Sequence, residues 1–370
     1  MNKRLVFLLA WILLLSFFAG TAVASVLDDE VLSQHIREAD GTTGQDTWRG
    51  SGIKTDHIQN GAITSTKIRN YAITPYKIAP NAIYPPHISA GAVTPDKVSF
   101  YNNVVIVAPA GGDFASPVDA VNSIVDASET NPYLVKIMPG VYEIGSQSVQ
   151  MKPYVDIEGS GQNVTKIRGN IAVETAGVVN ASSDAELRFL TVENNGTGTW
   201  SIGVRIQDAA PKLTHVNVEV TGASTNAAGI YNVTFGGLVT SIKDSRSFTS
   251  GGAVCYAMYN YSGTVRANDT AFLAQCPGAT NFAFFNGNYS PQLRRCTMSA
   301  TNGAANYSLW NALGYPRIEG SIMNGPILPE GGTSYIANTR VSNGVSAGSG
   351  ILKCVGSYNA SFDPLGADCL

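Results

Sequence analysis

A repeat of about 26 residues is the feature that most constrains how this chain can fold. Gly177, Gly203 and Gly229 are separated by 26 residues each. The series continues in steps of 28, 26 and 25 residues through Ala257, Ala283 and Ser308. Apolar and polar residues alternate within each block, which indicates strands, and strands at such a period indicate a solenoid. The sequence therefore predicts an all-β parallel β-helix over residues 99–345, with about nine coils and a right-handed course.

Two further features concern the inside of the solenoid and its start. Each block is closed by an asparagine in four successive repeats: Asn232, Asn260, Asn286 and Asn311. Asparagine tolerates left-handed backbone, and its amide can donate to the next coil, so we expect these side chains to stack at one bend. At the start of the solenoid, Ser116-Pro117 is an N-cap signal for a helix. Val118, Val121, Ile124 and Val125 would then cover the first coil.

Alternation along the repeat also assigns aromatic residues to faces. Strict alternation places Tyr256, Phe282 and Tyr307 in the core with Met258. It places a second set on the outer face, called the aromatic column here: Tyr231, Tyr259, Phe285 and Trp310. An exposed column of rings favours a sugar or a partner chain as ligand, and a C-terminal loop folded over it is the alternative.

The N-terminus predicts export. Lys3 and Arg4 precede an apolar run over 5–18, and Ala22-Val23-Ala24 is a cleavage signal, so residues 1–24 read as a signal peptide. An uncleaved anchor is the alternative, although the run is short for a hydrocarbon layer of ~30 Å. No later segment is apolar enough to span a membrane, so we expect a secreted or cell-surface chain. A net charge of −3 without a Lys/Arg run argues against nucleic acid as a partner.

A ten-residue repeat occupies residues 53–98, after a polar leader at 25–52. Apolar residues recur every ten positions at Ile58, Ile68, Ile78, Ile88 and Val98. Five prolines forbid a long helix, and a single copy buries little, so the repeat predicts self-association of several chains. The segment resembles the Ile-Thr-x-x-Lys-Ile repeats of phage tail fibres and bacterial surface fibres, and with it we expect a homo-oligomer, a homotrimer in the first place. A proline-rich linker is the alternative.

Five cysteines suit an oxidising compartment. Cys354 and Cys369 would close a short loop in the tail, residues 346–370. Cys255, Cys276 and Cys296 have no Cys-x-x-Cys spacing and no neighbouring histidine, so the sequence predicts no metal site there, and one of the three is left over.

The first half of the solenoid resembles the pectinesterase family. The resemblance covers about residues 104–220 and rests on five segments: 111–114 (Gly-Gly-Asp-Phe), 138–143 (Met-Pro-Gly-Val-Tyr-Glu), 157–161 (Ile-Glu-Gly-Ser-Gly), 165–167 (Thr-Lys-Ile) and 190–194 (Leu-Thr-Val-Glu-Asn). It implies the pectin-lyase-like right-handed β-helix.

The catalytic motifs of that family are missing. Trp200 stands where the family has a glutamine, and 219–222 reads Glu-Val-Thr-Gly instead of Gln-Asp-Thr. The Asp-Phe-Ile-Phe-Gly motif is replaced by Lys-Asp-Ser-Arg-Ser at 243–247, and no Gly-Arg-Pro-Trp follows. Esterase chemistry therefore does not carry over with the fold.

Three acidic residues are the remaining catalytic candidates. Glu193 and Glu219 are 26 residues apart and should stack one coil apart at ~4.8 Å. That separation approaches the ~5–5.5 Å of retaining glycosidase carboxylates, and a Ca²⁺ between them is an alternative. Asp208, beside Arg205, is a weaker candidate or a surface ion pair.

The sequence favours a fibre-like surface protein without catalysis or cofactor, binding glycan through the aromatic column. The alternative is a polysaccharide-active enzyme (lyase, hydrolase or carbohydrate esterase) that uses Glu193, Glu219 or Asp208.

Overall fold

We analysed a computed structural model of the chain, which describes residues 62–68, 72, 77–78, 88, 101 and 103–370. The chain divides into two units, residues 1–92 and 93–370. The predicted signal peptide and the predicted leader fall outside the described residues, as does most of the ten-residue repeat.

The described part of the repeat contains one contact that recurs with its period. A short 3₁₀ turn, η4, spans Ser65–Lys67. Lys67 Nζ donates to the carbonyl of Ala62 at 2.9 Å, and Lys77 Nζ donates to the carbonyl of Ala72 at 2.7 Å. The same local contact thus recurs ten residues later. Self-association through this segment stays a prediction.

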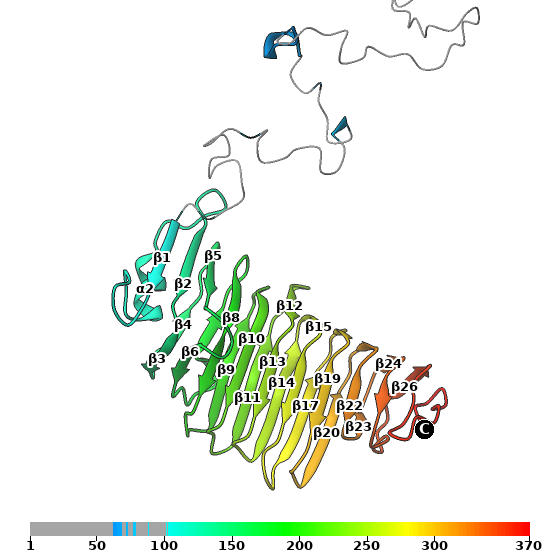
Figure 1. Cartoon of the computed structure of the whole chain (residues 1–370). Coiled ribbons are helices and arrows are strands. Elements are labelled where there is room, and N and C mark those ends of the chain that lie inside the picture. Colours follow the sequence, from blue (N-terminus) through cyan, green and yellow to red (C-terminus); the bar gives the residue numbers. More distant parts are fainter. Residues whose placement is uncertain (1–61, 69–71, 73–76, 79–87, 89–100, 102) are drawn as a thin grey trace, which may run out of the picture. The chain divides into compact units, whose positions relative to one another are not determined.

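The second unit is a parallel β-solenoid of about nine turns, and the predicted fold class is confirmed. Figure 1 shows the coils stacked along one axis from β1 to β26. Every pair of neighbouring strands is parallel, and each complete coil has three walls. One predicted repeat of about 26 residues therefore corresponds to one coil of the solenoid.

Two walls belong to one 18-stranded sheet, and β8 and β10 run through both. The first wall contains β1 (Asn103–Val107), β2 (Tyr133–Ile137), β5 (Val155–Glu158), β8 (Glu186–Asn194), β10 (Lys212–Val220), β12 (Val239–Lys243), β15 (Thr264–Asn268), β18 (Gln292–Arg294), β21 (Arg317–Glu319), β24 (Thr333–Ala337) and β26 (Ile351–Val355). The second wall contains β3 (Gly140–Gly145), β6 (Thr165–Gly169), the ends of β8 and β10, β13 (Arg246–Thr249), β16 (Ala271–Ala274), β19 (Thr297–Ala300), β22 (Ile322–Asn324) and β25 (Arg340–Val341).

The third wall is a separate 8-stranded sheet. Its strands are β4 (Val149–Gln150), β7 (Val179–Ala181), β9 (Trp200–Gln207), β11 (Asn226–Val233), β14 (Val254–Ser262), β17 (Thr280–Asn286), β20 (Ala305–Asn311) and β23 (Ile327–Pro329). The core between the walls consists of ladders in which like residues stack. One of them contains Val204, Ile230, Met258, Phe284 and Leu309, all buried.

The small residues of the repeat mark a break in strand alternation. Ala257 and Met258 are consecutive and both fully buried, so two successive side chains face the core. The opposite wall is close at this ladder, since a Cβ on Gly229 would lie 2.0 Å from Ser247 Oγ, and one on Gly203 would lie 2.3 Å from Val218 Cγ1. Only small side chains fit such an approach.

This break corrects one prediction about faces. Phe282 is buried as predicted, with 2% of its surface exposed, but it stacks in a row with the half-buried rings of Tyr256 and Tyr307, with centroid separations of 5.1 and 5.5 Å. Tyr256 also meets Tyr259 edge to face at 4.9 Å, so both rings are on the outer side of the third wall. Strict alternation failed here because it assumes an unbroken pleat.

The asparagine ladder forms inside the solenoid. Asn232 donates to Asn260 at 2.8 Å, Asn260 to Asn286 at 3.0 Å, and Asn286 to Asn311 at 2.8 Å, all between side-chain amides. All four residues are fully buried. The predicted stacking is therefore confirmed. The left-handed backbone expected at these asparagines is absent, because none of the four has a positive φ.

Left-handed residues instead form the bend between the first and second walls. This column contains Phe189, His215, Asp244, Asp269, Arg295, Gly320, Asn338 and Gly356. The next residue points inward and is usually a hydroxyl residue whose Oγ donates to the carbonyl two residues earlier, as Ser245 does at 2.7 Å and Thr270 at 2.8 Å. Cys296 occupies the same position, with Sγ 3.3 Å from the carbonyl of Arg294. The leftover cysteine thus serves as a ladder residue.

Cys296 should therefore be unreactive in the folded protein. Disulfides join Cys255 to Cys276 and Cys354 to Cys369, and Cys296 is free and buried. Burial raises the pKa of its thiol to about 11, so little thiolate exists at pH 8. We expect a thiol reagent to label one cysteine per chain in denaturant and none in the native protein over the same time. Fast labelling of the native protein would contradict the assignment.

Both ends of the solenoid are covered. Helix α2 (Pro117–Ser123) contacts β1, β2 and β4, and its N-cap Ser116 accepts from the backbone N–H of Val118 at 3.2 Å. The helix ends before Val125, which is 89% exposed, so its predicted place in the stripe is wrong. At the other end, β26 extends the solenoid beyond residue 345, and the backbone N–H of Cys354 in β26 donates to the carbonyl of Ala367 in the disulfide-closed tail. Among the described residues, no helix is long and apolar enough to cross a membrane.

Candidate functional site

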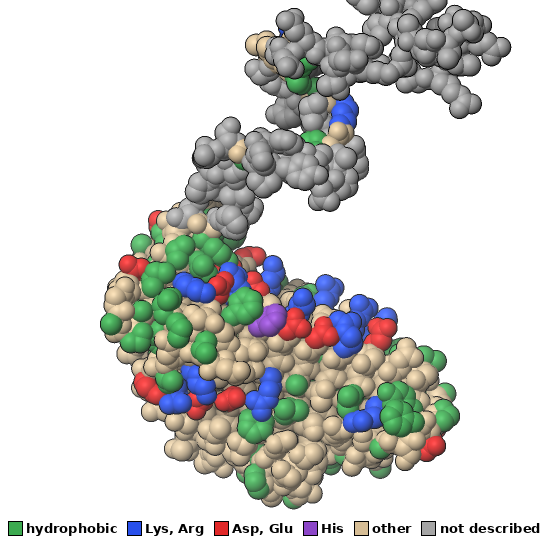
Figure 2. Space-filling view, viewed as in Figure 1, with side chains coloured by type: hydrophobic (Ala, Val, Ile, Leu, Met, Phe, Trp, Pro, Cys, Tyr) green, Lys and Arg blue, Asp and Glu red, His purple; other side chains and the backbone are tan. Residues whose placement is uncertain are grey.

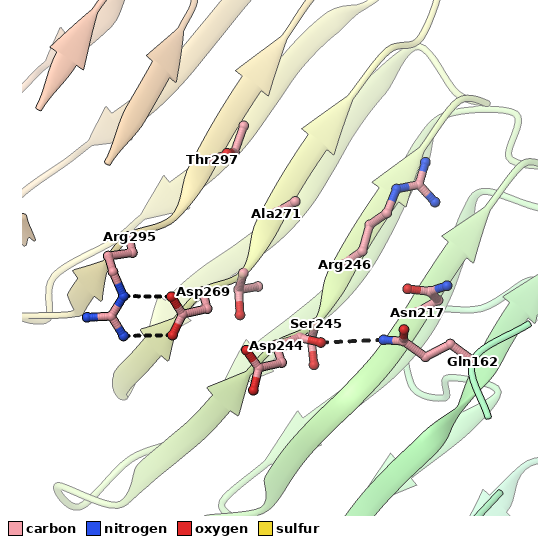
Figure 3. Close-up of a pocket in the computed structure, with 10 residues that line it drawn as sticks. Gln162, Asn217, Asp244, Ser245, Arg246, Asp269, Ala271, Arg295 and Thr297 are labelled. Atoms are coloured by element: carbon pink, nitrogen blue, oxygen red, sulfur yellow. Dashed lines mark hydrogen bonds and ion pairs between the residues drawn. The ribbon is translucent and has the colours of Figure 1, made fainter. Parts of the chain in front are cut away.

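A polar groove lies along the left-handed bend, between the first and second walls. It is open to solvent, with a volume of about 460 Å³. Its lining comes from successive coils (Figure 3) and includes Gln162, Asn217, Asp244, Arg246, Asp269 and Arg295. Because the bend residues stack coil over coil, the groove follows the solenoid axis. We call it the aspartate groove.

Asp269 is held in this groove by an arginine from the next coil. Arg295 Nε and one of its terminal nitrogens donate to the two carboxylate oxygens at 2.6 and 2.7 Å (Figure 3). These hydrogen bonds lower the pKa of the Asp269 carboxyl below its ordinary value. Asp269 is therefore a carboxylate throughout the neutral and mildly acidic range, with a fixed orientation.

Asp244 lies one coil before Asp269 and has no such clamp. Its Oδ2 is 3.6 Å from Lys243 Nζ and 3.9 Å from His215 Nε2. The His215 ring stacks on Phe189 with a centroid separation of 5.0 Å, which fixes its position on the bend. The side-chain amide of Gln162 reaches across the groove and donates to the backbone carbonyl of Asp244 at 3.4 Å.

The groove thus presents two carboxylates on neighbouring coils, whose strands are ~4.8 Å apart. One carboxylate has a guanidinium clamp and the other has an imidazole beside it. Two carboxyl groups placed close together are the pair that most glycoside hydrolases use. The amides of Gln162 and Asn217 and the guanidinium of Arg246 add hydrogen-bonding groups suited to hydroxyl-rich ligands.

Glu193 and Glu219 stack on neighbouring strands, as their spacing predicted. Each is neutralised by cations. Glu193 pairs with Arg168 at 3.1 Å, and Glu219 pairs with Arg246 at 3.1 Å. Lys166 Nζ lies 3.6 Å from Glu193 and 4.0 Å from Glu219, so an ammonium group occupies the place considered for a calcium ion. The network stabilises the outer face of the second wall.

Asp208 lies apart from both acidic groups. It follows β9 in the third wall, and its Oδ1 accepts from the backbone N–H of Phe235 at 3.2 Å. Arg205 Nε donates to the carbonyl of Glu174 at 3.0 Å, and no ion pair joins it to Asp208 within 103–370. Asp208 thus holds a turn, and none of the three predicted acids lines the groove.

The aromatic column forms on the outer side of the third wall, with its ring faces already occupied. Tyr231 and Tyr259 stack at 4.8 Å with 6° between planes, and Tyr259 and Phe285 stack at 4.8 Å with 5°. Trp310 meets Phe285, and Trp200 meets Tyr231, edge to face. A sugar C–H group approaches the negative face of a ring, and these rings offer mainly their edges. The stack therefore resembles a structural ladder more than a sugar platform.

The tail does not provide the cover that was the alternative for this column. The hydrogen bonds of the tail go to the last coils, such as those from Tyr358 to Thr339 and from Ser349 to Glu330. A different segment reaches the start of the column, where the Tyr231 hydroxyl donates to Glu174 Oε1 at 2.6 Å. Burial and this carboxylate raise the pKa of Tyr231.

The groove residues were missed from the sequence because they carry no motif. Asp244 and Asp269 are 25 residues apart, and each precedes a hydroxyl residue, Ser245 or Thr270. This pattern of an acid followed by Ser or Thr, in phase with the coil, was the available signal. It marks a bend as readily as a site, because Asp tolerates the left-handed region.

No protein-family model matches the chain, and no curated protein matches its sequence. Solved structures do match its fold. A pectin methylesterase from carrot is 14% identical, with 70% of this chain and 89% of that chain covered and a TM-score of 0.48. Pectin methylesterase PemA from Erwinia chrysanthemi is also 14% identical, with 73% of this chain and 92% of that chain covered and a TM-score of 0.44. ORF18 of Geobacillus virus E2 is 12% identical, with 69% of this chain and 60% of that chain covered and a TM-score of 0.43. At these identities the similarity concerns the fold alone: this chain is similar to pectin-lyase-like parallel β-helix proteins.

Proposed function

We propose that the chain is a polysaccharide-active enzyme of the glycoside hydrolase type, with its substrate lying along the aspartate groove. The observation that carries the proposal is the pair of Asp244 and Asp269 on neighbouring coils of an open polar groove. Their backbones lie one coil, ~4.8 Å, apart, so that the two carboxyl groups can take up the ~5–5.5 Å separation of retaining glycosidases.

The settings of the two acids suggest their roles. Asp269, ionised and oriented by Arg295, is the carboxylate that attacks or stabilises the anomeric carbon. Asp244, 3.9 Å from His215 and 3.6 Å from Lys243, is the second carboxyl group that a glycosidic oxygen would meet in the groove. Asn217 and Gln162 lie along the same groove and would bind sugar hydroxyls on either side.

A second candidate is a glycan-binding surface protein without catalysis. One observation favours it: both carboxylates of the groove have cationic neighbours, so the groove could bind without cleaving. The edges of the aromatic column would then serve as a second contact, and a fibre-like N-terminal segment would present the solenoid.

The predicted signal peptide is compatible with either function, since structural and capsular polysaccharides are found outside the cytoplasm. Two disulfides in the solenoid and its tail suit an oxidising compartment. We therefore propose that the chain acts after secretion or at the cell surface.

Product analysis on a panel of polysaccharides tests the proposal. The full chain is incubated with neutral and acidic polymers, and new reducing ends, unsaturated products and released methanol are measured separately. Hydrolysis predicts new reducing ends without absorbance from unsaturated sugars and without methanol. Unsaturated products would indicate a lyase and methanol an esterase, and either would overturn the assignment. Binding without any product would favour the second candidate.

A further inference from the structure

A stripe of cations runs along the outer face of the first wall, beside the aspartate groove. From β10 to β21, each strand of this wall carries one exposed Lys or Arg, and β26 carries another. The stripe contains Lys212, Lys243, Arg266, Arg294, Arg317 and Lys353. Figure 2 shows a row of Lys and Arg side chains next to the acidic row that begins at the histidine. We call this set the cation stripe.

The register of the wall makes the stripe regular. One column of stacked positions carries a cation on every second coil, at Lys212, Arg266, Arg317 and Lys353. Between them in the same column are Ser241, Gln292 and Tyr335. Lys243 and Arg294 are two residues further along the intervening strands, so successive coils from β10 to β21 place a cation about every 4.8 Å.

The charge of the stripe is largely uncompensated. From β12 to β26, the outer face of the first wall carries one acid, Glu319, which pairs with Arg294 at 3.3 Å. Lys243 lies 3.6 Å from Asp244 at the edge of the groove. Lys212, Arg266, Arg317 and Lys353 take part in no ion pair within the part of the chain that the structure describes. Uncompensated like charges in a line cost stability, and an anionic partner would remove that cost.

The groups between the cations suit a saccharide. Ser241 and Gln292 can bind hydroxyls. Tyr335 is 37% exposed, and the cationic groups of Arg317 and Lys353 lie 5.5 and 5.8 Å from its ring centroid. An exposed ring flanked by two cations offers a contact for a sugar ring that carries an acid group.

We propose that the cation stripe binds a linear acidic polysaccharide, with its anionic groups spaced along the solenoid axis and about one sugar per coil. This inference deepens the proposed function, on which its choice of a saccharide rests, because it names the substrate class. A polymer held on the first wall would lie along the bend where Asp244 and Asp269 face the solvent.

The width of the stripe favours a single polymer chain over nucleic acid. Asp244 and Asp269 follow β12 and β15 at the bend, and Glu319 pairs with Arg294 on the wall itself, so a ligand with anions on a broad surface would meet these acids. A duplex or an anionic membrane needs a wide basic face, since its affinity comes from many phosphates. The stripe offers only two adjacent columns of cations, two residues apart along the strands.

A neutralised variant tests the inference. In the full chain, Lys212→Gln, Arg266→Gln and Arg317→Gln are combined, and the matched control combines Lys212→Arg, Arg266→Lys and Arg317→Lys. Calorimetric titration at low salt uses polygalacturonate, with a carboxylate on each sugar, and neutral dextran. Each cation near a dense array of anions contributes roughly a factor of five, so the neutral variant should bind polygalacturonate about a hundredfold more weakly. The charge-retaining control should bind like the wild type, and dextran should not bind.

Unchanged binding in the neutral variant would overturn the inference. So would tighter binding of the wild type to single-stranded DNA or anionic phospholipid vesicles than to polygalacturonate. The proposed function fails separately: if the stripe binds polygalacturonate but no new reducing ends form on any polymer, the stripe stands and hydrolysis does not. If the chain cleaves a neutral glycan and the neutral variant is as active as the wild type, hydrolysis stands and the stripe does not.

Discussion

Replacing Asp269 by Asn is expected to slow the release of reducing ends by a factor of about 10²–10⁴, because it removes the carboxylate proposed to attack or stabilise the anomeric carbon. The substitution keeps the size and the hydrogen-bonding shape of the side chain. It removes the negative charge that Arg295 holds in place at 2.6 and 2.7 Å. Binding of the polymer should change little, because the cation stripe is unaffected. The measurement is kcat and KM for the wild type and variant on the polymer that the panel identifies.

Glu193→Gln is the matched control for the loss of one carboxylate. Glu193 is engaged by Lys166 and Arg168, away from the groove, so its removal should leave kcat within a few-fold of the wild type. The reverse pattern, with Glu193 essential and Asp269 dispensable, would contradict the assignment of the site.

The pH profile gives a second test of the same residue. Arg295 lowers the pKa of Asp269, so the carboxylate persists as the pH falls, and the acidic limb of kcat/KM should lie below the ordinary range of an aspartate. Arg295→Gln removes the cause, and the limb should move to higher pH. A limb that does not move would show that another group controls it.

Asn260→Ala should strongly destabilise the solenoid, because it removes one member of the buried asparagine ladder. Asn260 accepts from Asn232 at 2.8 Å and donates to Asn286 at 3.0 Å and to the carbonyl of Gly263 at 3.1 Å. All these groups are buried, and the alanine leaves a donor and two acceptors without their partner. At about 1–3 kcal/mol for each of these three unsatisfied buried groups, the free energy of unfolding should fall by at least about 3 kcal/mol.

Urea unfolding monitored by circular dichroism measures this loss, with Asn288→Ala as control. Asn288 is exposed in a turn, so its replacement should change stability by less than about 0.5 kcal/mol. If Asn260→Ala were as stable as Asn288→Ala, the ladder would be a consequence of the fold and not a source of its stability.

The sequence predicted the ladders because the coil period is written directly into residue spacing. Gly203 and Gly229, and Glu193 and Glu219, lie in adjacent coils, and the asparagines stack as expected. What failed was the assumption of an unbroken pleat. Ala257 and Met258 both face the core, and Tyr256 just before them lies on the outer side with Tyr259. Such a break depends on how closely the opposite wall approaches, which no local pattern contains.

The groove and the stripe could not be found from local runs of residues. Lys212, Arg266 and Arg317 are more than fifty residues apart in sequence, and the solenoid brings them into one column. A search for consecutive Lys and Arg therefore sees nothing, although the folded wall is basic. Asp244 and Asp269 were hidden in the same way, because a coil period and not a motif unites them.

A crystal structure of the Asp269→Asn variant with a bound acidic oligosaccharide tests the hydrolase account most directly. We expect density for consecutive sugar rings that cross the coils along the bend, with acid groups toward Arg266 and a glycosidic oxygen near Asp244. Density confined to the rings of Tyr259 and Trp310, with the bend empty, would contradict it.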